Sequence, residues 1–297
     1  MNILITGSTG LIGSALISSF TTGEHQITRL VRSKPRPGMG EVFWNPQDGS
    51  IEMPGLEGMD AVVHLAGETI AERWTAEKKA RIRDSRVNGT RLLSESLARL
   101  AQPPNVVVCA SAIGYYGDRG DDVLREDSPP GSGFLAEVCR EWEAAAAPAV
   151  QQGLRVVHLR IGVVLSPAGG ALAKMLPPFR MGVGGRIGSG RQYMSWIAID
   201  DLIGVFHYAL TTESLTGPVN AVAPNPVTNL EFTNTLGRVL GRPTLFPLPA
   251  VAARLAFGEM ANDLLLASTR VEPAQLLSIG YTFRYPELEG ALQHLLG

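Results

Sequence analysis

Short apolar runs alternate with longer amphipathic segments through the first half of the chain. The runs at residues 3–6, 26–31, 60–66, 105–110 and 154–160 predict strands, and the segments 11–20, 76–100 and 134–151 predict helices. Residues 61–66 and 106–110 are apolar at nearly every position, as strands of a parallel sheet are when helices cover both of its faces. The pattern therefore predicts an α/β fold with a doubly wound parallel sheet of the Rossmann type.

The composition of the chain changes after Arg160, where glycine becomes frequent. Seven glycines lie between Gly169 and Gly190, and we expect this segment to line a binding cleft or to form a lid. We expect strands at 193–199 and 218–222 to return to the sheet, separated by a helix that Asp200 caps and that ends near residue 210. The predicted organisation is a Rossmann domain over residues 1–165, whose sheet is completed by about 193–222, and a smaller C-terminal lobe on the substrate side, formed by 166–192 and 223–297.

The strongest local signal is the turn that follows the first strand, which we call the dinucleotide turn. It comprises Gly7, Ser8, Thr9, Gly10, Leu11, Ile12 and Gly13. Gly7 permits a tight turn, Gly10 lets backbone N–H groups approach a pyrophosphate, and Gly13 lets the following helix pack close to the sheet. The pyrophosphate is expected at the N-terminus of that helix, where unpaired N–H groups and the helix dipole favour an anion.

The end of the second predicted strand indicates which dinucleotide binds. An acidic residue at this place bonds the ribose hydroxyls of NAD, whereas a basic residue accommodates the 2′-phosphate of NADP. Here the chain reads Val31-Arg32-Ser33-Lys34, without a carboxylate. A guanidinium group suits bidentate phosphate recognition, so Arg32, supported by Ser33, predicts NADP or NADPH as the cofactor.

Composition excludes several other partners. Lys and Arg number 26 against 28 Asp and Glu, for a formal net charge of −2, which gives no electrostatic reason to expect nucleic acid. No run of eighteen apolar residues occurs, so we expect no membrane partner. Cys109 and Cys139 lack metal-like spacing and are expected to be buried thiols of a cytoplasmic protein without a metal site. The oligomeric state stays open.

Two later segments resemble the cofactor-binding motifs of the extended short-chain dehydrogenase/reductases, which include nucleotide-sugar epimerases and dehydratases. Residues 63–67 (Val-His-Leu-Ala-Gly) resemble the strand motif that runs beside the cofactor, and residues 84–90 resemble the helix that carries a cofactor-contacting Asn. Arg86 occupies the position of that Asn. The resemblance implies cofactor contacts from Leu65, Ala66, Gly67 and Arg86.

Residues 111–118 and 188–202 resemble the catalytic and substrate-side segments of the same superfamily. The first implies a catalytic role for Ser111, and Tyr115 or Tyr116 is the candidate for the phenol. With Gly67-Glu68, Arg73-Trp74 and the segment around Gly280, the chain resembles more narrowly an atypical group that is often labelled nucleoside-diphosphate-sugar epimerases.

The proton relay of that superfamily is missing. It needs a Tyr and a Lys four residues later on one helix face, where the ammonium group lowers the pKa of the phenol. None of the six tyrosines has Lys at this spacing, and Phe134 stands near the expected place of the Tyr. Two functions therefore stay open: an NADP(H)-dependent oxidoreductase or epimerase with an unconventional acid/base group, and a catalytically silent NADP-binding regulatory protein.

The substrate is less well defined than the cofactor. The superfamily commonly places an Arg six residues after the first glycine of the Gly-x-Gly, but that position is Met194 in this chain. Arg180, Arg186 and Arg191 are the candidates to replace it. We expect a small substrate with a hydroxyl or carbonyl group, and a sugar nucleotide is one alternative.

Overall fold

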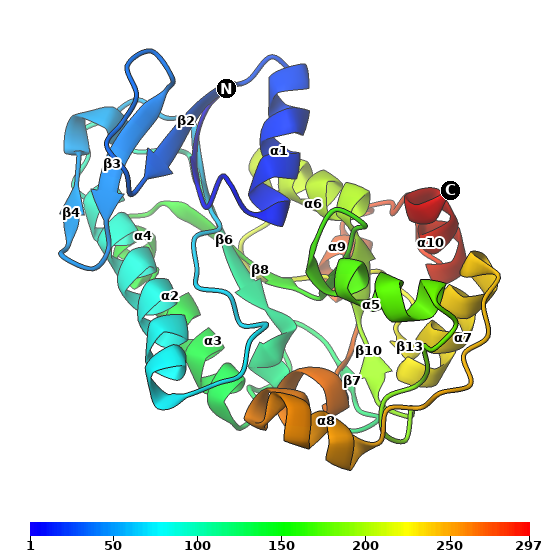
Figure 1. Cartoon of the computed structure of the whole chain (residues 1–297). Coiled ribbons are helices and arrows are strands. Elements are labelled where there is room, and N and C mark those ends of the chain that lie inside the picture. Colours follow the sequence, from blue (N-terminus) through cyan, green and yellow to red (C-terminus); the bar gives the residue numbers. More distant parts are fainter.

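The computed structural model describes residues 1–297 and is built around an eight-stranded sheet (Figure 1). Its strands are β1 (Asn2–Thr6), β2 (Gln26–Val31), β3 (Glu41–Asn45), β4 (Ser50–Ile51), β5 (Ala61–His64), β6 (Val106–Ala112), β8 (Arg155–Ile161) and β12 (Gly217–Ala221). They lie in the order β12-β8-β6-β5-β1-β2-β3-β4, and all neighbours are parallel except β3 and β4. The predicted doubly wound parallel sheet is confirmed.

Helices cover both faces of the sheet. They are α1 (Leu11–Thr22), α2 (Ala76–Leu97), α3 (Phe134–Ala144), α4 (Ala147–Gln151) and α6 (Ile199–Thr211), with 3-10 turns η1 (Met53–Leu56) and η2 (Ile113–Tyr116). Apolar side chains of α1 and α6 pack into a core on one face, and those of α2 and α4 into a second core on the other. Because β5 and β6 lie between these layers, every residue of β5 is buried.

The chain beyond β8 departs from the prediction in three places. Short pairs form outside the main sheet: β10 (Tyr193–Met194) with β13 (Val227–Thr228), and β11 (Trp196–Ala198) with β9 (Val163–Leu165). The predicted return of residues 193–199 to the sheet is therefore wrong, although β12 does complete it. Asp200 does not cap α6, which begins at Ile199 after Ala198. The glycine-rich segment contains a helix, α5 (Gly170–Arg180).

The remaining elements form the C-terminal lobe seen on the right and at the bottom of Figure 1. They are α7 (Asn229–Leu240), α8 (Ala250–Phe257), the π-helical η3 (Ala261–Leu266), β14 (Arg270–Val271), α9 (Ala274–Ser278) and α10 (Leu288–Leu296), and β14 pairs with β7 (Val123–Leu124). A third apolar core joins α5, α7 and α10. None of the helices combines the length and the apolar character needed to span a bilayer.

The carboxyl ends of β1 and β5 are joined by a buried hydrogen-bond hub. The Thr6 hydroxyl accepts the N–H groups of Leu65 and Ala66, both at 3.0 Å, and lies 2.8 Å from Nδ1 of His64. Its own proton therefore points to Nδ1, and His64 Nε2 lies 2.9 Å from the hydroxyl of Thr90 on α2. This arrangement requires a neutral imidazole, and complete burial lowers the pKa of His64 from 6.5 to about 4.

We expect His64 to make the fold sensitive to acid. The unfolded chain takes up the proton below about pH 6.5 and the folded chain only near pH 4, so stability falls as the pH drops through this window. Between about pH 7.5 and pH 5 the loss should be about 2 kcal/mol. Denaturant unfolding at a series of pH values should show this loss in the native chain and about 2 kcal/mol less of it in His64→Gln. A substitution of an exposed residue that does not titrate, Gln293→Asn, should keep the native pH dependence, and an identical slope in His64→Gln would contradict the assignment.

Candidate functional site

The dinucleotide turn fits its surroundings only because two of its residues lack a side chain. Gly7 has φ +67°, and a Cβ at this position would lie 2.8 Å from the carbonyl carbon of Leu65. A Cβ on Gly13 would overlap the carbonyl oxygen of Gly7. The turn is thus pressed against both the end of β5 and the first turn of α1. These contacts give the first and third glycines the structural roles that the sequence predicts for them.

The middle of the turn is open. A Cβ on Gly10 would meet only the Gly7 oxygen, at 3.4 Å. Gly10 is also the N-cap of α1, where no side chain caps the helix and no acidic residue occupies the first turn. The first-turn N–H groups, which have no acceptor within the helix, are therefore available to an anion. The geometry fits the pyrophosphate of a dinucleotide.

Arg32 and Ser33 emerge next to this turn. Strand β2 pairs with β1 so that Leu30 lies opposite Thr6, and both Arg32 and Ser33 are exposed. The Arg32 side chain has no hydrogen-bond or ion-pair partner in the chain. The pKa of the Glu68 carboxyl is lowered, chiefly by its hydrogen bond from Lys78 and also by the charge of Arg32. An unpaired guanidinium thus stands at the edge of the site.

Arg86 supports the segment that follows β5. Its guanidinium donates to the carbonyl oxygens of Glu68 and Ile82, both at 3.0 Å, and lies 5.0 Å from the centre of the Trp142 ring. A Cβ on Gly67 would lie 3.2 Å from the guanidinium carbon. Burial lowers the pKa of Arg86. Arg86 therefore holds the loop at residues 67–68 in position.

Ser111 belongs to a buried network of charged and polar groups. It is the next-to-last residue of β6, opposite Arg160 of β8, and its hydroxyl donates to Glu143 at 2.7 Å. Glu143 on α3 also accepts two hydrogen bonds from Arg160, both at 2.9 Å. Burial opposes the charge on Arg160, but the carboxylate of Glu143 raises the pKa of the guanidinium above its ordinary value. Ser111 is 3% exposed, so its hydroxyl faces this ion pair.

Within the same network, the two neighbouring tyrosines have different surroundings. The Tyr116 hydroxyl is fully buried, donates to Asn220 at 2.7 Å and accepts from Arg160 at 3.0 Å. Burial raises the pKa of Tyr116 to about 12, so its position does not fit the predicted role of an exchangeable proton donor. Tyr115 is only half-buried, its ring lies 3.5 Å from the Arg160 guanidinium carbon, and its hydroxyl makes no hydrogen bond within the chain.

The helix that would carry the Tyr/Lys pair of the superfamily carries other residues here. Phe134 starts α3, and Val138 follows it four residues later. The ring of Phe134 packs against Trp74 at 5.2 Å, and the Lys79 ammonium group lies 4.6 Å from its centre. Lys79 is itself paired with Glu259 at 2.7 Å. At the spacing that the resemblance gives to the Tyr/Lys pair, α3 carries Phe134 and Val138, and Phe134 makes an aromatic contact with Trp74. The Arg160 guanidinium lies against the ring of Tyr115.

The predicted substrate arginines differ in their surroundings. Arg186 donates to the carbonyl oxygens of Gly188 and Ser189 at 2.9 and 2.8 Å, so it holds its own loop and is not free for a ligand. Arg180 and Arg191 are exposed at the surface. Another arginine, which the sequence did not indicate, is half-buried without an ion pair: Arg270 lies 4.8 Å from the Tyr193 ring, and its Nε atom is buried without an acceptor.

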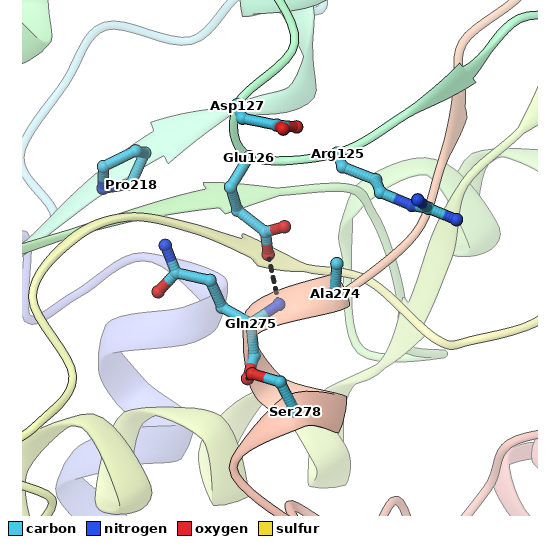
Figure 2. Close-up of a pocket in the computed structure, with 7 residues that line it drawn as sticks. All are labelled: Arg125, Glu126, Asp127, Pro218, Ala274, Gln275 and Ser278. Atoms are coloured by element: carbon cyan, nitrogen blue, oxygen red, sulfur yellow. Dashed lines mark hydrogen bonds between the residues drawn. The ribbon is translucent and has the colours of Figure 1, made fainter.

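A cavity of about 430 Å³ lies at the far edge of the sheet, away from the dinucleotide turn. Its lining, drawn in Figure 2, is Arg125, Glu126, Asp127, Pro218, Ala274, Gln275 and Ser278. The Glu126 carboxylate accepts the N–H groups of Asn220 and Gln275 at 3.0 and 3.2 Å. It thereby satisfies the free edge of β12, where Pro218 has no N–H. The residues that line this cavity therefore serve to close the free edge of the sheet.

Comparison with known proteins agrees with the fold and with the dinucleotide turn. Residues 3–221 match the NAD dependent epimerase/dehydratase family, and residues 248–295 match a domain of unknown function, DUF1731. An epimerase family protein of Mycobacterium bovis is 45% identical over 291 residues, which cover 98% of this chain and 96% of the relative. The predicted resemblance to an epimerase-like group is confirmed.

Solved structures extend the comparison. The crystal structure of human epimerase family protein SDR39U1 (isoform 2) with NADPH has a TM-score of 0.91 and 37% identity and covers 99% of both chains. A nucleoside-diphosphate sugar epimerase from Corynebacterium glutamicum has a TM-score of 0.83 and 42% identity; the match covers all of this chain and 58% of that one. Since the family match spans residues 3–221 and these relatives match nearly the whole chain, the protein belongs to the NAD dependent epimerase/dehydratase family.

Proposed function

We propose that the protein binds NADP(H) and catalyses oxidoreduction or epimerisation of a small substrate with a hydroxyl or carbonyl group. The observation that carries the cofactor is the uncapped N-terminus of α1 beside the unpaired Arg32 guanidinium. The NADPH bound to the human relative supports the same choice of cofactor. No cluster of His, Cys, Asp or Glu that could hold a metal ion occurs in the structure, so the proposal involves none.

Each part of the cofactor has a place in this proposal. First-turn N–H groups of α1 hold the pyrophosphate, while Arg32 and Ser33 hold the 2′-phosphate. Leu65, Ala66 and Gly67 lie beside the dinucleotide, on a segment that Thr6 and Arg86 keep in position. Bound nicotinamide supplies the hydride acceptor or donor.

Tyr115 is the proposed proton donor and acceptor. Its hydroxyl has no partner in the chain, and the Arg160 cation lies against its ring at 3.5 Å. The guanidinium of Arg160 packs against the Tyr115 ring and so holds the phenol in place while it passes a proton to or from a substrate oxygen. Ser111 acts one step further away: it bonds Glu143, which holds Arg160 in place. We therefore propose Ser111 as a positioning residue.

Arg270 is the proposed contact for a negatively charged part of the substrate. It is half-buried, it has no ion-pair partner, and its Nε atom lacks an acceptor inside the protein. Without an ion-pair partner the positive charge of the half-buried guanidinium is not neutralised, so an anionic ligand that accepts from its terminal N–H groups gains a strong interaction. Tyr193 supports the guanidinium on its flat face. A phosphate or carboxylate, including the diphosphate of a sugar nucleotide, fits this chemistry.

One observation favours a second function. Phe134 and Val138 replace the residues of the dyad, and both are engaged in apolar packing. A catalytically silent NADP(H)-binding protein, whose cofactor state regulates a partner, retains the dinucleotide turn without any need for Tyr115. The two functions differ in turnover. An oxidoreductase consumes NADPH with a carbonyl substrate and an epimerase interconverts two epimers without net consumption of cofactor, whereas a silent protein does neither.

Arg32→Gln should selectively weaken the binding of NADPH. Loss of a charged hydrogen bond to the 2′-phosphate costs about 1.5–3 kcal/mol, which is roughly a tenfold to hundredfold rise in Kd. Calorimetric titration should show this rise for NADPH and an unchanged affinity for NADH, which lacks the phosphate. The exposed Arg99→Gln serves as the matched control and should bind both as the native chain does. An equal loss of affinity for NADPH and NADH would contradict the contact between Arg32 and the 2′-phosphate.

The glycines of the turn should separate folding from binding. Gly13→Ala forces a Cβ into the Gly7 carbonyl and should lower the free energy of unfolding by about 1–3 kcal/mol. Gly10→Ala meets no such obstacle and should change stability by less than about 1 kcal/mol, yet its methyl group occupies the approach of the pyrophosphate and should weaken NADPH binding at least about tenfold. Denaturant unfolding and titration measure the two effects. Unaltered NADPH affinity in Gly10→Ala would contradict the placement.

Tyr115→Phe should abolish proton transfer without loss of cofactor. In a screen of small carbonyl compounds with anionic groups, the native protein should oxidise NADPH, and the variant should do so about a hundredfold more slowly with the same Kd for NADPH. The neighbouring Tyr116→Phe removes two buried hydrogen bonds, to Asn220 and from Arg160, so it should lower stability by about 1–3 kcal/mol and leave the catalytic step in place. Native protein that binds NADPH, consumes none with any compound and interconverts no hydroxyl epimers in the presence of NADP would favour the silent function. Full activity in Tyr115→Phe would refute this residue assignment.

A further inference from the structure

The C-terminal lobe exposes an unusual number of large apolar side chains on one strip of surface. They belong to the end of α5, the loop between α7 and α8, and the outer face of α8. We call them the apolar strip: Met181, Val183, Leu245, Phe246, Val251 and Leu255. Their exposed fractions range from 49% for Val183 to 76% for Leu245, whereas single exposed apolar residues are ordinary on soluble proteins.

The strip is continuous, because its segments run side by side. Gly182 approaches Pro243, with 3.7 Å from a Cβ added to it to the proline ring. Further along, the N–H of Phe246 donates to the Gly184 oxygen, and a Cβ on Gly188 would lie 3.6 Å from Ala250, the first residue of α8. Figure 1 shows α8, in orange, at the outer border of the lobe, with no other element outside it.

The two segments that form the strip carry charge of one sign. Residues 174–191 and 238–257 contain no Asp or Glu, and Glu259, which follows them, is paired with Lys79. Their basic residues are Lys174, Arg180, Arg186, Arg191, Arg238, Arg242 and Arg254. Arg180 and Arg242 flank the strip at Met181 and Pro243 and form no ion pair, while Arg238 pairs with Glu289. The two segments thus carry only positive charge, although the whole chain has a formal net charge of −2.

We propose that the apolar strip and its arginines bind the surface of an anionic lipid bilayer. Apolar side chains that enter the boundary between headgroups and acyl chains, together with cations at the level of the headgroups, are the combination that holds peripheral proteins on membranes. Leu245 and Phe246 are the deepest candidates, because they project from a loop between Pro243 and Pro247. A surface of this kind contains no membrane-spanning run of apolar residues. The lack of such a run in the sequence therefore gave no sign of it.

Other occupants fit the charge less well. Two copies of the chain that meet through this strip would bring their unpaired arginines together without a carboxylate from either segment, and like charges at an interface oppose association. An acidic protein would match the charge of the arginines. The strip, however, has only apolar side chains and guanidinium groups, and no acidic side chain that would fix the orientation of a bound protein. A fluid anionic membrane surface binds without a fixed orientation.

Sedimentation with lipid vesicles tests the proposal on the full chain. The protein should sediment with vesicles of phosphatidylcholine and phosphatidylglycerol and much less with phosphatidylcholine alone, and high salt should weaken the binding. The double variant Phe246→Ser/Leu255→Ser should bind anionic vesicles at least about tenfold more weakly, because two large apolar side chains no longer enter the bilayer. Arg180→Gln/Arg242→Gln should lose affinity mainly at low salt.

Matched controls separate this surface from general effects on folding. Leu277→Ser removes an apolar side chain that is 49% exposed outside the strip, and Arg99→Gln removes an exposed cation outside it; both should bind vesicles as the native chain does. All variants should retain the native affinity for NADPH. The proposal is overturned if folded native protein stays in the supernatant with anionic vesicles, or if Phe246→Ser/Leu255→Ser still binds them fully. It is also overturned if that variant instead dissociates a native dimer in analytical ultracentrifugation.

Discussion

Two backbone segments approach so closely at the carboxyl ends of β1 and β5 that only glycine fits between them. Gly7 turns against Leu65 with a positive φ, and Gly13 lies on the carbonyl of Gly7. This contact fixes where α1 begins and therefore where its free N–H groups point. The hydroxyl of Thr6 and the neutral ring of His64 hold the same junction from below. The cofactor site follows from this packing, because an anion can reach the start of α1 only where the turn leaves Gly10 open.

A second constraint lies beyond β5, where charge is buried. The pair formed by Glu143 and Arg160 connects α3 with β8, and Ser111 and Tyr116 satisfy its remaining hydrogen-bonding groups. Removal of one partner from such a pair leaves an uncompensated buried charge, so the pair acts as a rigid support. This support carries the guanidinium that faces Tyr115. The guanidinium of Arg160 on β8 thus lies beside the phenol of Tyr115.

The sequence predicts the sheet and the dinucleotide turn well because both depend on local patterns. Apolar runs mark β1, β5, β6 and β8, and glycine spacing marks the turn. The short strands β10 and β11 were misplaced, since their apolar residues pack against α5 and α7 in the C-terminal lobe, and nothing in the local pattern distinguishes that core from the main sheet. Strand β3 was missed because its residues are only partly apolar and lie near the edge of the sheet.

The candidate site likewise has features that the sequence could predict and features that it could not. The exposed position of Arg32 could be predicted, because it depends on one place at the end of a strand, and its contact with a 2′-phosphate stays a prediction. The burial of Ser111 and Tyr116 could not, because it depends on Glu143, Arg160 and Asn220, which lie far apart in the chain and meet only across α3, β8 and β12. Arg160 did carry a signal, as a charged residue that ends an apolar run next to Ser111 in strand register.

The binding of the 2′-phosphate is the step on which the choice of cofactor rests, and phosphorus NMR observes that group by itself. Titration of NADP bound to the native protein should show the second pKa of the 2′-phosphate at least about one unit below its ordinary value near 6, because the unpaired Arg32 guanidinium favours the dianion. A bound 2′-phosphate that titrates as it does in free solution would contradict the placement of the cofactor between α1 and Arg32.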